Sequence, residues 1–378
     1  MSDVESVAGP AIPAPLPPLA LSGAEEREFT ALVEAAGGKP FQARQLAHWI
    51  FRHGAADWSG CRNLPRRLLE TLAGRATIRS SHIATIDSAK DGTEKLLLQL
   101  QDGETVETVL IPEGERLTLC VSSQVGCPVG CVFCASGLDG VRRNLSTAEI
   151  VDQVLWARDR LAERQLGVPP TRITNLVVMG LGEPMLNLDA LLAALQRIGD
   201  PEGLALGARR ITVSTSGMPA RMRRFAEAPH AYNLAVSLHA ADDELRRRLV
   251  PTAKASVAEI VEAARAFFAA RGREVTFEVV LLAGVNDRPQ DADALVRALR
   301  GFPCTVNLIP WNPVDRIEGL ARPHDLRVDA FAESLRSRGL NVTVRRQRGA
   351  DRSAACGQLR LRHRDGAPLA TTPSTPRI

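Results

Sequence analysis

The sequence contains one short run in which three cysteines lie close together, Cys127-Pro-Val-Gly-Cys131-Val-Phe-Cys134. Three thiolates on one loop can hold a [4Fe–4S] cluster, because the irons of such clusters prefer cysteine ligands. Three protein ligands for four irons leave one iron open. The amino and carboxylate groups of S-adenosylmethionine can chelate that iron. The run therefore predicts that Cys127, Cys131 and Cys134 hold a cluster that starts radical chemistry, with the protein orienting the cofactor.

A tetrahedral zinc site, with Cys120 as a fourth thiolate, is the alternative for these cysteines. Zinc sites usually consist of two Cys-x2-Cys pairs, whereas this run has three and then two residues between its cysteines. The run also follows directly after a predicted strand that opens a β/α domain. Both features favour the cluster over zinc.

Alternating strand and helix patterns from residue 117 to about residue 346 must position this loop. Capping boxes open two of the helices, Ser146 with Glu149 and Ser256 with Glu259. Repeated strand–helix units predict a parallel sheet or barrel. Six units fall short of an eightfold barrel, so we expect a partial parallel (β/α)6 barrel with its chemistry at the carboxyl ends of the strands. Strands are expected at 117–122, 173–179, 211–214, 233–237, 275–282 and 305–309, with 342–345 as a candidate seventh.

Five zones are expected along this α/β chain. A Pro-rich flexible leader covers 1–21, and a small N-terminal helical accessory domain covers 22–76. A β-hairpin extension covers 77–116, with turns at Asp91-Gly92 and Asp102-Gly103 and with 95–101 paired to 105–111. The barrel core covers 117–360, and a disordered tail covers 361–378.

The composition limits the kind of protein this is. The chain of 378 residues is 45% hydrophobic, which is enough for a sizeable core, and its net charge is +4. Only 4% is aromatic, so a nucleic-acid surface cannot depend mainly on base stacking. Neither a signal peptide nor an apolar run of membrane-spanning length is visible, so we expect a cytoplasmic protein without disulfide scaffolding.

Two groups of basic residues are candidates for RNA contact. Phosphate binding is one interpretation of each; a solvated face is the alternative for the C-terminal group, and packing against the barrel is the alternative for the N-terminal one. The C-terminal group is Arg345, Arg346, Arg348, Arg352, Arg360, Arg362 and Arg364, and the N-terminal group is Lys39, Arg44, Arg52, Arg62, Arg66 and Arg67.

Beyond the cysteine run, the chain resembles a known family. Residues 120–137, CVSSQVGCPVGCVFCASG, are similar to the core of the RlmN/Cfr family of radical S-adenosylmethionine RNA methyltransferases. The likeness extends from about Phe41 to Leu359, and the pattern is more similar to the RlmN branch. Ala135-Ser136, Trp311 and the Pro-rich leader depart from the family pattern. Further motifs follow in the family's order: GLGEP at 180–184, STSG at 214–217, SLH at 237–239, NLIPWNP at 307–313 and AACGQL at 354–359.

The resemblance implies methylation of C2 of an adenosine in the peptidyl transferase centre of 23S rRNA and next to the anticodon of tRNA. C2 lies between two ring nitrogens and is electron-poor, whereas a deprotonated thiol is a good nucleophile for methyl transfer. The resemblance makes Cys356 the methyl carrier. One S-adenosylmethionine methylates its sulfur; a second yields a radical that activates this methyl group, which then joins Cys356 to C2. Cys120 would release the product through a transient disulfide with Cys356, and Glu107 would accept the C2 proton.

The remaining motifs are implied to hold S-adenosylmethionine. Glu183 would receive its amino group, and Gly182 allows close backbone approach. Taken alone, ordinary loop hydrogen bonds explain each of these residues, His239 above all, and Glu107 is taken for an exposed carboxylate. Cys61 and Cys304 match no motif and are expected to be buried. The implied set is Gly182, Glu183, Ser214, Ser237, Leu238, His239 and Asn312.

Other functions stay open at this point. A Cfr-type enzyme would methylate C8 of the adenine instead of C2. A non-catalytic zinc or iron–sulfur RNA-binding protein would have no need of Cys120, Cys356 and Glu107, and a radical enzyme for a small molecule would not need the methyl-carrying thiol. We further expect a monomer that receives electrons from a donor such as flavodoxin or ferredoxin and that acts on an unstacked adenine.

Overall fold

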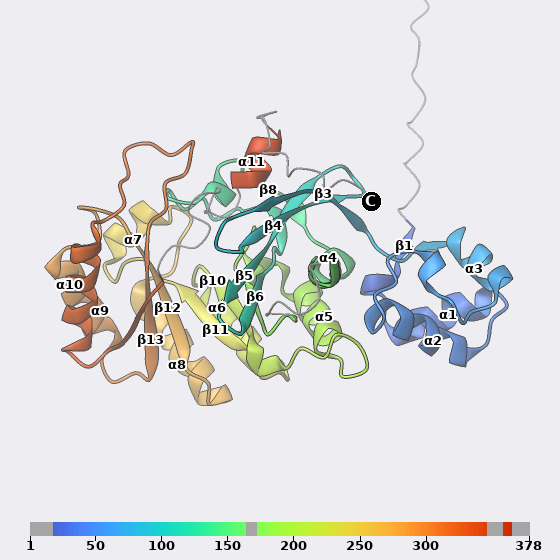
Figure 1. Ribbon diagram of the computed structural model, residues 1–378. Helices are drawn as coiled ribbons and strands as arrows, with labels where there is room; N and C mark the ends of the chain where they lie inside the picture. The colour runs from blue at the N-terminus through green and yellow to red at the C-terminus, as the bar shows by residue number, and fades with distance from the viewer. Residues whose placement is uncertain (1–17, 164–171, 346–357, 365–378) are drawn as a thin grey trace, which may run out of the picture.

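A ten-stranded sheet forms the centre of the computed structural model, which describes residues 18–163, 172–345 and 358–364. Seven of the strands run in parallel, each paired with the next, and the sheet ends at β14 without closing on itself (Figure 1). A partial parallel barrel is therefore confirmed, and its seventh strand is the candidate at 342–345. The parallel strands are β6 (Arg116–Cys120), β9 (Asn175–Val178), β10 (Ile211–Thr215), β11 (Asn233–Ser237), β12 (Val275–Leu281), β13 (Cys304–Pro310) and β14 (Asn341–Val344).

Helices connect these strands on the outside of the sheet. Both expected capping boxes are present: Ser146 and Glu149 exchange hydrogen bonds before α4, and Ser256 and Glu259 do so before α8. Each box satisfies backbone N–H groups that the first helical turn leaves unpaired. The helices are α4 (Thr147–Glu163), α5 (Leu188–Gly199), α6 (Pro219–Glu227), α7 (Asp243–Leu249), α8 (Val257–Arg271), α9 (Pro289–Leu299) and α10 (Asp325–Arg336), with short 3-10 helices at Ala135–Gly137 (η3), Pro184–Asn187 (η4) and Ala208–Arg210 (η5).

The β-hairpin extension is continuous with the barrel. Its strands β3 (Ser81–Ser88), β4 (Glu94–Leu100) and β5 (Thr105–Glu113) pair antiparallel, with turns at Gly92 and Gly103, both at φ +83°. The expected pairing of β4 with β5 is confirmed. The sequence did not predict that β5 also pairs with β6, so that hairpin and barrel share one sheet. A separate small sheet joins β7 (Gln124–Gly126) to β8 (Val141–Asn144).

The N-terminal helical unit lies beside the barrel, at the right of Figure 1. Arg158 of α4 donates to the carbonyl oxygens of Ile50 and Phe51 at the end of α2, and Arg79 pairs with Asp159. These contacts fasten the unit to the barrel. Its elements are β1 (Leu19–Ala20), η1 (Leu21–Gly23), α1 (Glu26–Ala35), α2 (Pro40–Phe51), η2 (Trp58–Gly60), α3 (Arg66–Ala73) and β2 (Ala76–Thr77).

The expected leader and tail are both too long. Residues 19–21 belong to the folded unit, because β1 pairs with β2 and Leu21 is fully buried. Likewise α11 (Gln358–Arg364) buries Leu361 where the disordered tail was expected to begin. In both places an apolar side chain lies next to the Pro-rich or charged segment. Its burial offsets the conformational entropy that the chain loses when it becomes ordered. The other leader and tail positions, 1–17 and 365–378, lie outside the described residues.

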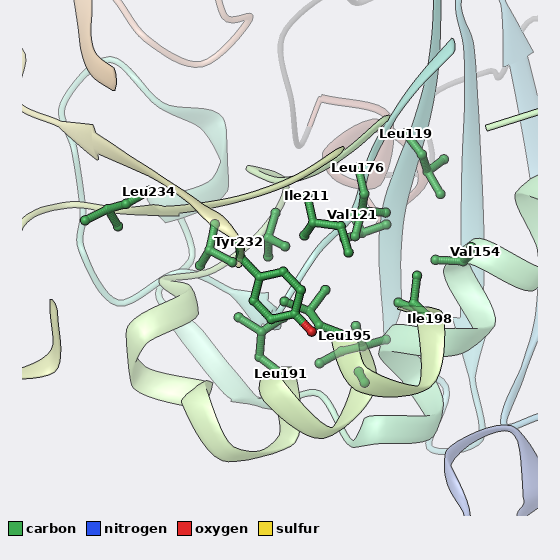
Figure 2. Close-up of a cluster of buried hydrophobic side chains, with 14 of the residues drawn as sticks. Leu119, Val121, Val154, Leu176, Leu191, Leu195, Ile198, Ile211, Tyr232 and Leu234 are labelled. Carbon is green, nitrogen blue, oxygen red and sulfur yellow. The ribbon is translucent and has the colours of Figure 1, made fainter. Parts of the chain in front are cut away.

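The main core lies between the sheet and its helices. Leu119, Leu176 and Leu234 of the strands belong to the same buried cluster as Leu191 and Leu195 of α5, part of which is drawn in Figure 2. Burial of each such side chain contributes about 1.5–3 kcal/mol. Side chains alternate along a strand, so these core residues leave their neighbours to face the opposite side of the sheet. None of the described helices is both long and apolar enough to cross a membrane.

Candidate active site

A cavity of about 330 Å³ lies at the carboxyl ends of the parallel strands. The alternation of side chains explains its lining: Val213 and Val236 point to the core, whereas Ser214 and Ser237 face the cavity. The same alternation explains why Leu238 packs in the core and does not line the cavity. The predicted site residues that line the cavity are Cys120, Cys127, Cys131, Cys134, Gly182, Glu183, Ser214, Ser237, His239 and Asn312.

The cysteine loop is held through its backbone. Val132 N–H donates to Leu249 O at 3.1 Å, and the Thr252 hydroxyl donates to Val129 O at 2.7 Å. The Trp311 indole N–H donates to Phe133 O at 2.9 Å. A phenylalanine at 311 has no N–H in its ring and could not make this last bond. The departure from the pattern therefore adds an anchor to the loop.

The electrostatics of Cys127 and Cys131 favour a cationic metal group. Burial, followed by the charges of neighbouring thiolates and of Glu183, raises the pKa of Cys127 to about 12 and that of Cys131 well above its usual value. Metal ligation needs thiolates, and the positive charge of irons would offset this cost. Three thiols on one loop are the donor set that a [4Fe–4S] cluster with one open iron needs.

Glu183 is a buried carboxyl group at the edge of the cavity. It is 2% exposed, and its two oxygens accept the backbone N–H groups of Met185 at 3.0 Å and Ser216 at 2.6 Å. Burial raises its pKa although both hydrogen bonds act in the opposite direction. Gly182 has φ +107°, and a Cβ there would lie 2.7 Å from the Cβ of Gln124. Glycine therefore lets this loop pass close to β7, and a cationic ligand would relieve the cost of ionising Glu183.

His239 is held as a neutral donor. Burial, with the nearby positive charge of Arg246, lowers its pKa to about 3. Its Nδ1 accepts the backbone N–H of Val280 at 3.3 Å, so the proton is on Nε2. The backbone has φ +61°, and the ring meets the edge of Phe133 at a centroid distance of 4.7 Å. The ordinary hydrogen bonds expected for His239 are thus present in a residue that also lines the cavity.

Ser214 and Asn312 keep one polar contact each within the protein. The Ser214 hydroxyl donates to Val178 O at 2.7 Å, and Asn312 Oδ1 accepts from Arg322 at 3.3 Å. Both side chains line the cavity from the ends of β10 and β13. Their remaining hydrogen-bonding capacity is suited to a polar ligand.

Cys120 and Glu107 lie on neighbouring strands. Cys120 ends β6 and is buried in the wall of the cavity. Glu107 of β5 is 3% exposed, so the expectation of an exposed carboxylate is wrong. The reason is tertiary: β5 is paired on both sides, and α11 covers it. One oxygen of Glu107 accepts the backbone N–H of Arg360 at 2.7 Å, and the other lies 3.9 Å from Nζ of Lys95.

Cys356 lies outside the described residues, which resume at Gln358. The side chain of Gln358 donates to Pro313 O at 3.1 Å, one residue after Asn312. With the bond from Arg360 to Glu107, this fixes the start of α11 between β5 and the loop that follows β13.

Three residues of this region belong to none of the sequence motifs and were not predicted. Arg246 is 1% exposed and donates to Ser216 O, next to the bond between Ser216 and Glu183. Its place in a run of three arginines favours a solvated surface and hides this role. Burial raises the pKa of Glu278 to about 7, although Asn307 donates to it at 2.7 Å. A lone charge within the apolar strand Val275–Leu281 was the available signal. Lys95, which is 4% exposed, lines the cavity from β4.

Two family models match the chain. The radical SAM superfamily model matches residues 121–296, which hold the cysteine loop and most of the barrel. The model described as the ribosomal RNA large subunit methyltransferase N-terminal domain matches residues 19–78, the helical unit.

Similar proteins cover nearly all of the chain. A probable dual-specificity RNA methyltransferase RlmN of Thermosynechococcus vestitus is 44% identical over 90% of this chain and 98% of its own length. The dual-specificity RNA methyltransferase RlmN of Anaeromyxobacter dehalogenans is 43% identical over 92% and 95%. The crystal structure of a radical SAM methyltransferase from Sphaerobacter thermophilus superposes with a TM-score of 0.85 at 43% identity, over 90% of this chain and 99% of that one.

Proposed function

Since the chain belongs to the RlmN family of radical SAM RNA methyltransferases, we propose that it methylates C2 of adenosine in 23S rRNA, at the peptidyl transferase centre, and in tRNA next to the anticodon. The observation that carries the proposal is that the three-thiol loop and Cys120 line the same cavity. A radical enzyme without a methyl-carrying thiol has no use for this additional buried cysteine.

Cys127, Cys131 and Cys134 hold the [4Fe–4S] cluster in this proposal. When bound, the cluster supplies the electron that cleaves S-adenosylmethionine and yields a carbon radical. The reaction uses one such radical for every methyl group transferred. Glu183 receives the amino group, and the neutral His239, Ser214, Ser237 and Asn312 offer hydrogen-bonding groups. Gly182 and Leu238 contribute backbone at the ends of β9 and β11. Two S-adenosylmethionine molecules are consumed per turnover.

Cys356 carries the methyl group between the two halves of the reaction. It is two residues from Gln358 in the sequence. Gln358 is bound to Pro313, beside the cavity residue Asn312. The short separation in sequence between Cys356 and Gln358 supports a carrier thiol that reaches the cavity. Its methyl carbon, once activated, forms the bond to C2 and joins the RNA to Cys356.

Cys120 and Glu107 complete the release of product. Glu107 accepts the proton from C2, and Cys120 forms a transient disulfide with Cys356 that frees the methylated RNA. Two observations support this: the backbone N–H of Arg360, four residues after Cys356 in the sequence, donates to the Glu107 carboxylate, and Cys120 lies on the strand that pairs with β5.

The RNA would have to present an unstacked adenine to this cavity. The helical unit, which matches an rRNA methyltransferase N-terminal domain, would hold the RNA backbone through its basic residues. We further propose a cytoplasmic monomer that is reduced by a donor such as flavodoxin or ferredoxin.

Mass spectrometry of rRNA and tRNA from a deletion strain tests the proposal. We expect loss of 2-methyladenosine from both RNAs and its return when the wild-type gene is restored. Loss of 8-methyladenosine would show the Cfr-type reaction instead. Unchanged 2-methyladenosine in both RNAs would contradict the proposed function.

A further inference from the structure

Exposed apolar side chains are concentrated around the cysteine loop. Seven large apolar side chains are exposed in the described part of the chain, and four of them belong to this loop or to segments beside it. The other three lie in the N-terminal unit and at the start of α10. Exposed apolar residues that gather in one place mark an interaction site, whereas single scattered ones do not. The four residues, here called the loop patch, are Val132, Leu138, Val141 and Leu186.

Backbone contacts hold β8 and η4 beside the cysteine loop. The N–H of Cys127 donates to the carbonyl oxygen of Gly140, next to Val141, at 3.0 Å. Further along β8, the side chain of Asn144 donates to Leu186 O at 3.3 Å. The remaining two residues of the loop patch lie within the cysteine run and four residues after it. The loop patch is therefore next to the segment that carries the predicted cluster ligands.

The loop patch does not face the active-site cavity. Val129 and Phe133 of the cysteine loop line the cavity, whereas Val132, between them in the sequence, does not. The other three residues of the loop patch are not part of the lining either. Because a target adenine must enter the cavity, a surface that faces away from it is available to a second partner.

Three exposed arginines flank the loop patch. Arg142 belongs to β8, and Arg247 and Arg248 belong to the last turn of α7. The carbonyl oxygen of Leu249, which ends α7, accepts the N–H of Val132 at 3.1 Å, so this turn lies against the cysteine loop. Positive charge is thus presented on two sides of the loop patch.

Two acidic residues lie near these arginines. Asp139, which is in the loop between η3 and β8, is paired with Arg316 at 3.6 Å. Glu244 is exposed, but it belongs to the first turn of α7, at the other end of the helix. The arginines of the last turn are therefore placed to meet an acidic partner.

A protein partner fits this surface better than RNA does. The apolar residues of the loop patch are all aliphatic, so they offer bases no aromatic ring for stacking. An apolar centre with arginine around it is typical of protein–protein interfaces. Weak electron-transfer complexes need little area, less than about 1,200 Å². Since electron transfer slows steeply with distance, a donor must also dock close to the cluster, as the loop patch allows.

We propose that the loop patch and its three arginines form the docking surface for an acidic protein that carries a single electron, of the flavodoxin type. One electron passes from the flavin hydroquinone to the cluster, so the flavin is oxidised to the semiquinone and the cluster is reduced, with no bond formed or broken. The inference rests on the proposed function, because it needs Cys127, Cys131 and Cys134 to hold that cluster.

Stopped-flow absorbance tests the charged part of the surface. It follows reduction of the cluster in the loaded full-length enzyme by flavodoxin hydroquinone, without RNA. Arg247→Glu with Arg248→Glu should lower the second-order rate constant at least tenfold at low salt, because steering by opposite charges raises association rates by about 10–1000-fold. The difference should shrink as salt screens the charges. Arg209→Glu with Arg210→Glu, an exposed adjacent pair before β10 at the amino end of the sheet, is the matched control and should follow the wild type.

A second double variant tests the apolar part. Leu138→Gln with Val141→Thr keeps every charge and keeps a β-branched residue in β8. It should lower the rate constant severalfold at low and high salt alike, because salt does not screen apolar contacts. Every variant should keep the wild-type iron content and the wild-type rate of reduction by dithionite, a small reductant that needs no docking surface.

Three results would overturn the inference. The first is an equal rate constant for the two arginine double variants at low salt. The second is a wild-type cluster that dithionite reduces and flavodoxin does not. The third is weaker binding of an rRNA fragment by the loop-patch variants with an unchanged flavodoxin rate, which would assign the surface to RNA.

Failure of the proposed function gives a different result. The assay contains no RNA, so an error in the target base or in the role of Cys356 leaves its outcome unchanged. A wild type that takes up no iron would remove the proposed function and the inference with it.

Discussion

Glu183 accepts the backbone N–H of Ser216 at 2.6 Å and thereby ties the loop after β9 to the loop after β10. The carbonyl oxygen of the same Ser216 accepts from the buried Arg246. The backbone of one residue, Ser216, thus connects a carboxylate that lines the cavity to a guanidinium whose charge acts on Cys131.

Glu183→Gln should weaken binding of S-adenosylmethionine while the iron content stays unchanged. Loss of a charged hydrogen-bond partner costs about 1.5–3 kcal/mol, which corresponds to roughly 10–150-fold in Kd. Burial raises the pKa of Glu183, so wild-type binding should weaken as the pH falls and the carboxyl becomes neutral. Equilibrium dialysis across pH measures both effects. Wild-type affinity in the variant would show that Glu183 does not receive the amino group.

Replacement of Cys127, Cys131 or Cys134 by alanine should remove the iron and abolish cleavage of S-adenosylmethionine. The anaerobically purified wild type should be brown with about four irons per chain. Cys304→Ala, a buried cysteine at the start of β13 outside the cavity, is the control and should keep its iron. Elemental analysis and absorption spectra measure the outcome. A colourless wild type that carries one zinc ion would contradict the cluster.

Glu278→Gln should make stability less dependent on pH. Burial raises the pKa of Glu278 from 4.5 to about 7, so the folded state holds this proton more tightly than the unfolded state. The wild type is therefore favoured below pH 4.5 and loses this contribution as the pH rises through about 7. Above that pH the variant should be more stable by roughly 2–4 kcal/mol, since Asn307 can still donate to the glutamine oxygen. Urea unfolding at pH 5 and pH 8 measures the difference; an equal pH response of both proteins would contradict it.

The sequence predicted the fold where local patterns and packing agree. Strand Asn233–Ser237 was predicted at its exact bounds because an apolar run ends at polar residues of the SLH motif. The pairing of β5 with β6 was missed because it depends on contacts across the sheet that no turn signal marks. It is this pairing that brings Glu107 next to the strand of Cys120.

The site was predictable only where residue type and spacing carry the chemistry. The spacing within the cysteine run was enough to predict the cluster ligands. The family motifs contain most of the residues that line the cavity. Arg246 and Lys95 were missed because buried cations look like surface cations in a sequence. Their burial becomes visible only when α7 and β4 are packed in place.

The central claim is the methyl-carrying role of Cys356 with Cys120 as the releasing thiol. Cys356→Ala removes the methyl acceptor, so neither adduct nor product can form. Cys120→Ala leaves the acceptor and the radical chemistry intact but blocks release. A denaturing gel with and without nuclease treatment, after reaction with RNA, distinguishes the two variants. The account predicts a nuclease-sensitive shifted band for Cys120→Ala and none for Cys356→Ala; methylated RNA from Cys356→Ala, or no adduct in either variant, would contradict it.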